Sequence, residues 1–507
     1  IASCRAAIRS CKRFTLNGGC VRFAFWTFAT HRASNGGYME ELKSTSRIKK
    51  TDSGLYRNLN VALVSVLNPR KKHPINKDLN GGLGTGDTIG TSWSSKLIQF
   101  MRKKTNRLPI IAFAHLHAIF EEKEVGNLNF FEGTLPNKRT QDFNLILIYG
   151  SIVDYHYENE VCSDLKRNYP LAKVGFFGEF PTRRPDLFES GDFVIMGEAE
   201  AYFTDEYSSL DALDGRVVVE KRTRLDSLPL PNLDQFELNN YEYKPGLISK
   251  PFITIQGSKG CPYSCSYYCT YGAFQGAAIR QRSASKIVDD IVELQRKYGI
   301  KSVQFRDPLF GVKKGLIEEF SAELKSRKVK LEWGMETRLD LLNEDNLSMM
   351  FDVGLRLINV GVETKDPFVA KQNKRKLVKE DYQERIVDYC RKKGIKVSAF
   401  YILGLESDTE ETIKETIEYA ISLNTFLARF SISTPYPGTA FFDDLNMAGR
   451  ILTHEYEEYT QFNLVYEHQN LTPAQAKRLL EYAYRRYYIR PLFFIELLKW
   501  KIRELWL

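Results

Sequence analysis

Short apolar runs alternate with amphipathic stretches through the first half of this chain. The apolar runs predict buried strands, and the amphipathic stretches predict helices. The predicted strands cover residues 59–66, 128–131, 143–149, 173–177 and 193–196, and the predicted helices cover residues 109–122, 156–168 and 185–190. This alternation predicts an α/β fold with a doubly wound, Rossmann-like parallel sheet, in which ligands lie beyond the carboxyl ends of the strands.

The same alternation of strands and helices continues from residue 250. The predicted strands cover residues 252–255, 302–305, 330–333, 356–360, 397–403 and 428–433, and the predicted helices cover residues 284–298, 315–326, 343–353, 381–393 and 409–423. Ser283 is the predicted N-cap of the first of these helices, and Gly299 is its predicted end. These strands and helices therefore form a second α/β region.

The two regions are joined by a proline-containing segment, Arg224–Phe236, which indicates an extended linker. From about residue 441 the pattern is helical, and Thr472 followed by proline predicts a helix over residues 472–488. Residues 492–507 are strongly apolar on one face. Such a helix more often packs on its own protein than on a membrane surface, and both alternatives remain open from the sequence.

The composition excludes several classes of protein. A chain of 507 residues predicts two or three domains, and a hydrophobic fraction of 43% is typical of a globular protein. No apolar run reaches the roughly 18 residues that a membrane span needs. Eight cysteines in so long a chain do not indicate a disulfide scaffold. We therefore expect a reducing, cytoplasmic environment.

Most of the net charge of +9 comes from the first 38 residues. That segment holds six basic residues and no acidic residue, so the rest of the chain carries +3. Nucleic acid is therefore not an expected partner. Residues 1–38 could be an organellar transit peptide, but their lack of a helical apolar period favours upstream sequence translated ahead of a start at Met39.

A cysteine-rich loop, Gln256–Gly276, follows the first predicted strand of the second region. Cys261, Cys265 and Cys269 lie within nine positions of this loop. Three thiolates can bind three irons of a [4Fe–4S] cluster and leave the fourth iron open to a small molecule. A structural zinc site would need a fourth nearby ligand, which the local sequence lacks, and three ordinary thiols are the other alternative.

This loop resembles the cluster loop of radical S-adenosylmethionine (SAM) enzymes, whose common pattern is C-x3-C-x2-C with an aromatic residue before the last cysteine. Here the spacing is C-x3-C-x3-C, and Tyr268 keeps the aromatic position. The resemblance covers about residues 58–490. It implies that residues 250–440 form a partial (β/α)6 barrel and that residues 441–507 form a helical C-terminal region. It also implies that Cys261, Cys265 and Cys269 bind the cluster.

The same resemblance implies the chemistry and a set of SAM contacts. The cluster would bind SAM at its open iron, and one electron from a partner such as flavodoxin or ferredoxin would produce a 5′-deoxyadenosyl radical. The candidate SAM-binding residues, most of them near the ends of predicted strands, are Tyr268, Asp307, Glu336, Arg338, Glu363 and Gly404. Each could equally be an ordinary turn or cap residue, but their recurrence after successive strands favours a shared ligand.

The first region, residues 58–222 with a linker over 223–249, looks like the cobalamin-binding domain that precedes many radical SAM barrels. The candidate cobalamin contacts are Ser151, Gly178, Gly197 and Glu198. The alternative is a Rossmann-like domain that has lost its cofactor. No D-x-H-x-x-G motif follows the first strand, so we expect no protein histidine on the lower face of cobalt. The glycines of residues 81–90 do not have dinucleotide-binding spacing.

The resemblance implies a cobalamin-binding radical SAM enzyme that methylates an unactivated carbon. The alternatives are a radical cyclisation or rearrangement on the same scaffold, or a non-catalytic iron–sulfur binding or sensor protein. The substrate, a small or lipid-like molecule, is not determined by the sequence.

Overall fold

The first sheet has six parallel strands in the order β3-β1-β4-β5-β6-β7. The computed structural model describes residues 54–71, 76–86, 88–103, 106–137 and 141–506, so the segment 1–38 and Met39 lie outside the described residues. The strands are β1 (Asn60–Ser65), β3 (Asn127–Glu132), β4 (Leu145–Tyr149), β5 (Lys173–Phe177), β6 (Phe193–Met196) and β7 (Gly215–Val218). This parallel arrangement confirms the predicted doubly wound sheet.

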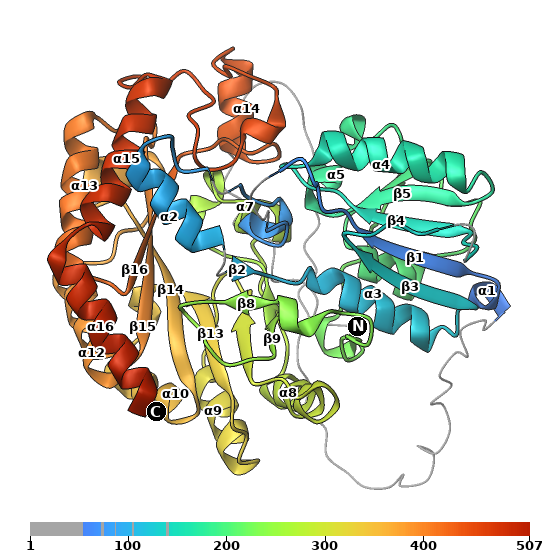
Figure 1. Ribbon diagram of the computed structural model, residues 1–507, viewed down its shortest axis with the longest axis horizontal. Coiled ribbons are helices and arrows are strands. Elements are labelled where there is room, and N and C mark those ends of the chain that lie inside the picture. The colour runs from blue at the N-terminus through green and yellow to red at the C-terminus, as the bar shows by residue number, and fades with distance from the viewer. Residues whose placement is uncertain (1–53, 72–75, 87, 104–105, 138–140, 507) are drawn as a thin grey trace, which may run out of the picture. The chain divides into compact units, whose positions relative to one another are not determined.

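The two faces of this sheet bury alternate residues of the same strands. On one face Leu63 and Leu147 share a core with Phe113 of α3 (Ile111–Glu122). On the other face Val64 and Ile148 pack with α4 (Tyr155–Asn168). Figure 1 shows α3 and α4 on opposite sides of the sheet.

The prediction of a helix over residues 185–190 is wrong. A short helix, α5 (Glu179–Arg183), comes earlier, and Pro185–Leu187 forms a single 3-10 turn. Pro185 has no backbone N–H to donate, so it cannot continue the helix that precedes it. The sequence analysis also missed α2 (Trp93–Lys103) and the edge strand β7.

The second sheet also has six parallel strands, in the order β16-β15-β14-β13-β12-β9. Their bounds are β9 (Phe252–Ile255), β12 (Ser302–Phe305), β13 (Glu332–Thr337), β14 (Leu355–Glu363), β15 (Lys396–Leu403) and β16 (Leu427–Ile432). Neighbours in the sheet are neighbours in the sequence, and the edge strands β9 and β16 are not paired in the part of the chain described. The sheet is therefore a partial barrel, as predicted.

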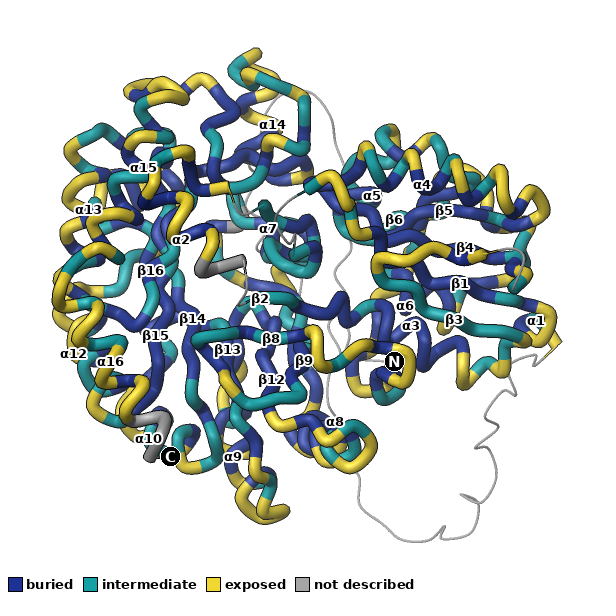
Figure 2. Tube along the Cα trace, viewed as in Figure 1, coloured by how far each residue is buried: buried dark blue, intermediate teal, exposed yellow. Residues whose placement is uncertain are grey.

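Helices cover the outer surface of the partial barrel (Figure 1). They are α8 (Ala284–Tyr298), α9 (Leu316–Ser326), α10 (Glu344–Asp352), α12 (Glu380–Lys393) and α13 (Glu410–Leu423). Ser283 accepts a hydrogen bond from the Lys286 N–H, and Gly299 ends α8 in the left-handed conformation, which confirms both predicted caps. Figure 2 shows the strands buried and the outer faces of these helices exposed.

The C-terminal region is helical. It contains α14 (Ala440–Met447), α15 (Pro473–Tyr488) and α16 (Pro491–Trp506), and α15 begins with a capping box between Thr472 and Gln475. Trp500 of α16 is buried and packs on Phe426 with ring centroids 5.3 Å apart. No helix among the described residues has the length and apolarity needed to cross a membrane.

Candidate functional site

The cysteine loop is folded into two short helical turns. A 3-10 turn, Ser264–Tyr267, precedes α7 (Thr270–Gln275). The Cys269 N–H donates to the Cys265 carbonyl at 2.9 Å, and the Cys261 N–H donates to the Gly276 carbonyl at 2.9 Å. Cys265 and Cys269 are thus one helical turn apart, which accommodates the extra residue of the C-x3-C-x3-C spacing.

The three thiols share a poorly hydrated environment. Burial, followed by repulsion from the Cys265 thiolate, raises the pKa of Cys269 to about 12. Burial also raises the pKa of Cys261. The Arg375 guanidinium lies 3.9 Å from the Cys265 sulfur and donates a hydrogen bond to it. Three thiols beside a cation suit iron ligation, and iron binding would release their protons.

A single metal ion is a poorer fit to this loop. Among the described residues, no three His, Cys, Asp or Glu side chains come together as a group that could hold one ion. A cubane cluster differs, since each thiolate binds its own iron. The donor set therefore fits the cluster better than the zinc alternative.

The thiols line a cavity of about 300 Å³ inside the partial barrel, here called the barrel cavity. Four of the predicted SAM contacts line it with them, namely Tyr268, Glu336, Arg338 and Glu363. Glu363 is the last residue of β14 and has φ of 70°, a strained backbone angle for a residue with a side chain. Burial raises its pKa, which the Arg375 and Arg338 charges partly oppose.

Two predicted SAM contacts do not line the barrel cavity. Asp307 is fully buried, and its carboxylate accepts hydrogen bonds from the Gly257 N–H and the Ser258 hydroxyl, each at 2.7 Å. Gly404 has φ of 72°, and its carbonyl accepts from the Tyr466 hydroxyl at 2.7 Å. Both residues shape the loops around the cavity.

A second cavity, of about 110 Å³, lies at the carboxyl ends of β4, β5 and β6 and is here called the sheet-edge cavity. Gly178, Gly197 and Glu198 line it, as predicted for a ligand at this edge. Both glycines have positive φ angles, 121° and 131°, so the backbone can turn there without a side chain. Glu198 bonds to Arg280 at 3.0 Å and lies 3.6 Å from Lys259.

The sheet-edge cavity is smaller than the roughly 300–1,000 Å³ of ordinary small-molecule sites. A ligand as large as cobalamin therefore requires the lining residues to move. The left-handed glycines at the strand ends still suit close approach of a large planar ligand to the backbone.

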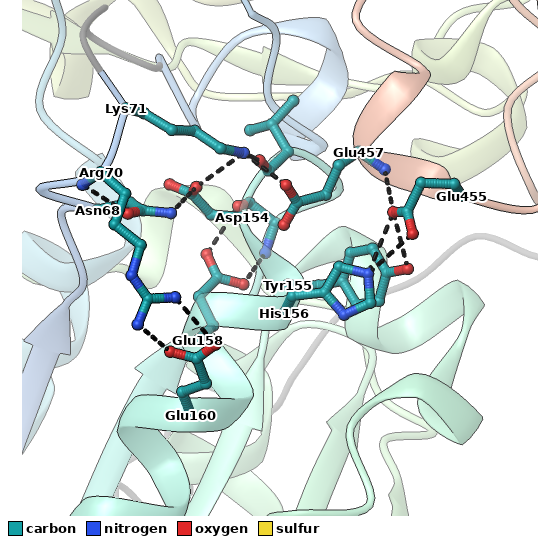
Figure 3. A network of polar contacts seen from close by, with 12 residues as sticks. Asn68, Arg70, Lys71, Asp154, Tyr155, His156, Glu158, Glu160, Glu455 and Glu457 are labelled. Carbon is teal, nitrogen blue, oxygen red and sulfur yellow. Dashed lines mark hydrogen bonds and ion pairs between the residues drawn. The ribbon is translucent and has the colours of Figure 1, made fainter.

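Ser151 does not line the sheet-edge cavity but bonds to Glu158, which belongs to the polar network of Figure 3. Its hydroxyl donates to Glu158 at 2.7 Å, and Glu158 accepts from Lys77 at 2.6 Å. In the same network Asp154 lies 3.1 Å from Lys71, and His156 lies 3.0 Å from Glu455. The partial D-x-H motif at Asp154 is thus engaged in structural contacts.

Several cavity residues were missed by the sequence analysis. Arg306 and Tyr271 line both cavities and so form a wall that the two share. Arg306 bonds to Asp78, to Glu336 and to the Tyr271 hydroxyl. No sequence signal marks these partners, because they come from three separate segments.

His115 also lines the sheet-edge cavity and was missed. Burial lowers its pKa to about 3, so the ring is neutral, and its Nδ1 atom has no hydrogen-bond partner among the described residues. The pattern of α3 showed this residue as part of an apolar helix.

Comparison with known proteins identifies the second region. The radical SAM superfamily matches residues 255–420. An uncharacterized methyltransferase of Pyrococcus horikoshii is 26% identical over 53% of this chain and 57% of its own length. The anaerobic magnesium-protoporphyrin IX monomethyl ester cyclase of Cereibacter sphaeroides is 25% identical over 60% of this chain and 51% of its own length. The chain thus spans little more than half of these relatives.

The fold of both regions together has a solved counterpart. The radical SAM methyltransferase TsrM from Kitasatospora setae, with cobalamin and a [4Fe–4S] cluster bound, superposes with a TM-score of 0.55 at 15% identity. The match covers 77% of this chain and 78% of TsrM. The fold and the cysteine loop define a radical SAM protein with an N-terminal domain of the cobalamin-binding type. Residues 255–420 of this chain are thus a radical SAM domain.

Proposed function

We propose that this protein is a cobalamin-dependent radical SAM enzyme that methylates an unactivated carbon. The observation that carries the proposal is the shared wall, since Arg306 and Tyr271 line both the cavity of the three thiols and the cavity at the sheet edge. A methyl group would have a short path between ligands held in two adjoining cavities.

The cofactors would supply the chemistry, and the residues of the chain would hold and orient them. When bound, the cluster delivers an electron that cleaves a carbon–sulfur bond of SAM, and cobalamin carries the methyl group. Cys261, Cys265 and Cys269 would hold the cluster, and Arg375 would offset the negative charge of their thiolates. Glu363, held at the end of β14, would orient SAM. Walls of buried aromatic and aliphatic side chains would exclude water from a radical.

The proposal includes an external electron donor, such as flavodoxin or ferredoxin, because the described residues include no second cysteine-rich loop. Relatives named as methyltransferases support methyl transfer. Relatives named as cyclases support radical cyclisation as the second candidate.

Anaerobic turnover tests the proposal. The reconstituted protein is incubated with cobalamin, a reductant and SAM carrying a deuterated methyl group. We expect 5′-deoxyadenosine and deuterated methylcobalamin. Release of 5′-deoxyadenosine without label on cobalamin would favour cyclisation, and release of neither product would leave a binding or sensor protein.

We also propose that α16 makes peripheral contact with a membrane surface. Leu492, Phe494, Ile495 and Leu498 are 47–59% exposed on this helix. Co-sedimentation with anionic lipid vesicles tests the contact, and a Leu498→Glu variant should reduce it. Equal sedimentation of both proteins would contradict the contact.

A further inference from the structure

The barrel cavity holds one positive charge that has no carboxylate within ion-pair distance among the described residues. Its arginines are Arg306, Arg338, Arg375 and Arg429. The first three lie within ion-pair distance of Glu336, Asp340 and Glu363 respectively. For Arg429, no carboxylate of the described residues lies within ion-pair distance. Arg429 is partly buried, so water satisfies only part of its charge, and an anion that reached this guanidinium would gain a cation without a carboxylate partner among the described residues.

Arg429 lies in a cluster of incompletely bonded polar groups. It donates to the Tyr243 hydroxyl at 3.3 Å, and the Asn359 side chain donates to the same hydroxyl at 3.3 Å. Tyr243 and Asn359 are buried, yet Asn359 Oδ1 has no hydrogen-bond partner among the residues that the structure describes. The hydrogen of the Tyr243 hydroxyl also has no acceptor in the described parts of the chain. Three side chains, from two strands and the linker, therefore lie together and can form further hydrogen bonds to a ligand.

Aromatic rings flank this cluster. The Arg429 guanidinium lies 5.5 Å from the ring centroids of both Tyr243 and Phe400. Phe430 and Tyr484 also line the cavity. An anion bound to Arg429 would therefore belong to a molecule with an apolar body.

The cluster lies deeper in the barrel than the positions proposed to hold SAM. Asn359 precedes Glu363 by four residues on β14, which places it about 13 Å back along the strand at 3.3 Å per residue. In the strand register Arg429 of β16 pairs with Phe400 of β15, and Phe400 pairs with Gly361 of β14. Gly361 lies two residues before Glu363. The amino acid part of SAM belongs at the cysteines, so its carboxylate does not neutralise Arg429.

We propose that Arg429, Tyr243 and Asn359 form the subsite for the carboxylate of the methyl acceptor, and that this substrate is a small organic acid with an apolar body. The inference rests on the proposed function. A carboxylate carries one negative charge, which matches the single positive charge of Arg429, and its two oxygens can accept from this guanidinium in parallel. A phosphate, with close to two negative charges, would be left under-neutralised.

Binding of matched acids and amides tests the subsite. Equilibrium dialysis is performed on the full-length, cluster-reconstituted, SAM-loaded protein, with 3-phenylpropionate and hexanoate compared with their amides. We expect the wild type to bind each acid at least ten times more tightly than its amide. Arg429→Gln should bring the two within about twofold, and Arg429→Lys should retain part of the preference because it keeps charge but loses the planar fork.

Arg356→Gln is the matched control. Arg356 also lies 4.3 Å from an aromatic ring centroid and bonds to backbone carbonyls, but it does not line the cavity. This variant should keep the full preference for acids. A wild type that binds both members of a pair equally, or binds neither, would overturn the subsite, as would a preference that survives in Arg429→Gln.

Release of 5′-deoxyadenosine is measured on the same wild-type preparation without a probe. A protein that prefers acids but releases no 5′-deoxyadenosine would refute the proposed function and leave the anion site. A protein that releases 5′-deoxyadenosine but shows no preference would refute the subsite alone.

Discussion

Replacing Asp307 by asparagine should change how the stability of the protein depends on pH. The Asp307 carboxylate is fully buried and bonded to Gly257 and Ser258, at the start of the cysteine loop. Burial raises its pKa from 3.8 to about 7, against the opposing effect of these hydrogen bonds. Asparagine has nearly the same shape, can accept from Gly257 and donate to Ser258, and does not titrate.

The sign of the effect follows from proton binding. Because the folded state holds the proton of Asp307 more tightly than the unfolded state, stability falls as pH rises from about 4 to about 7 and then levels off. The whole difference in pKa corresponds to about 4 kcal/mol at 1.36 kcal/mol per pH unit. Between pH 5 and pH 8 the wild type should lose about 3 kcal/mol relative to the variant.

Urea denaturation of both apo-proteins at pH 5, 6, 7 and 8 measures this difference. Other buried carboxyl groups with raised pKa values, such as Asp78 and Asp408, titrate in both proteins and cancel. The variant should also bind SAM within about twofold of the wild type, since Asp307 does not line the barrel cavity. Parallel stability curves together with a tenfold loss of SAM affinity would refute this reasoning and make Asp307 a SAM contact.

Replacing Cys261, Cys265 and Cys269 together by alanine should abolish iron and sulfide after anaerobic reconstitution, and Cys269→Ala alone tests the third ligand; a full cluster in the triple variant would contradict the ligand set. Arg306→Gln leaves the partly buried carboxylates of Asp78 and Glu336 without their cation and should cost about 3 kcal/mol in urea denaturation. A loss below about 1 kcal/mol would show that the ion pairs are dispensable. Bound cob(II)alamin should show no axial nitrogen splitting in electron paramagnetic resonance, and a three-line splitting that disappears in His115→Ala would identify this histidine as a lower ligand.

The strands and helices of the partial barrel could be predicted closely because their local signals agree. Residues 284–298 were predicted from an apolar period with a serine cap and a terminal glycine, and α8 has these bounds. By contrast, β7 is an exposed edge strand without apolar alternation. The helix α2 exposes Trp93 and Leu97, so its apolar residues did not mark a buried face.

The candidate site was less predictable, because the direction in which a side chain points depends on tertiary contacts. Arg306 and Asp307 are adjacent at the end of β12, and the sequence favoured the acid as a ligand contact. In the structure Arg306 lines both cavities, whereas Asp307 bonds to the start of the cysteine loop. Lys259, in the cysteine loop, and His115, on α3, likewise reach the sheet-edge cavity, and the sequence analysis predicted neither contact.

The wall formed by Arg306 and Tyr271 makes the two cavities thermodynamically dependent on each other. The sheet-edge cavity must widen to admit a large ligand, and any displacement of Arg306 disturbs its bond to Glu336 in the barrel cavity. A ligand in one cavity that shifts the Arg306 side chain changes the affinity of the other cavity for its own ligand. The ligand of the other cavity then changes the affinity for the first ligand by the same factor. SAM titrated with and without cobalamin should therefore give two dissociation constants whose ratio equals that of cobalamin titrated with and without SAM.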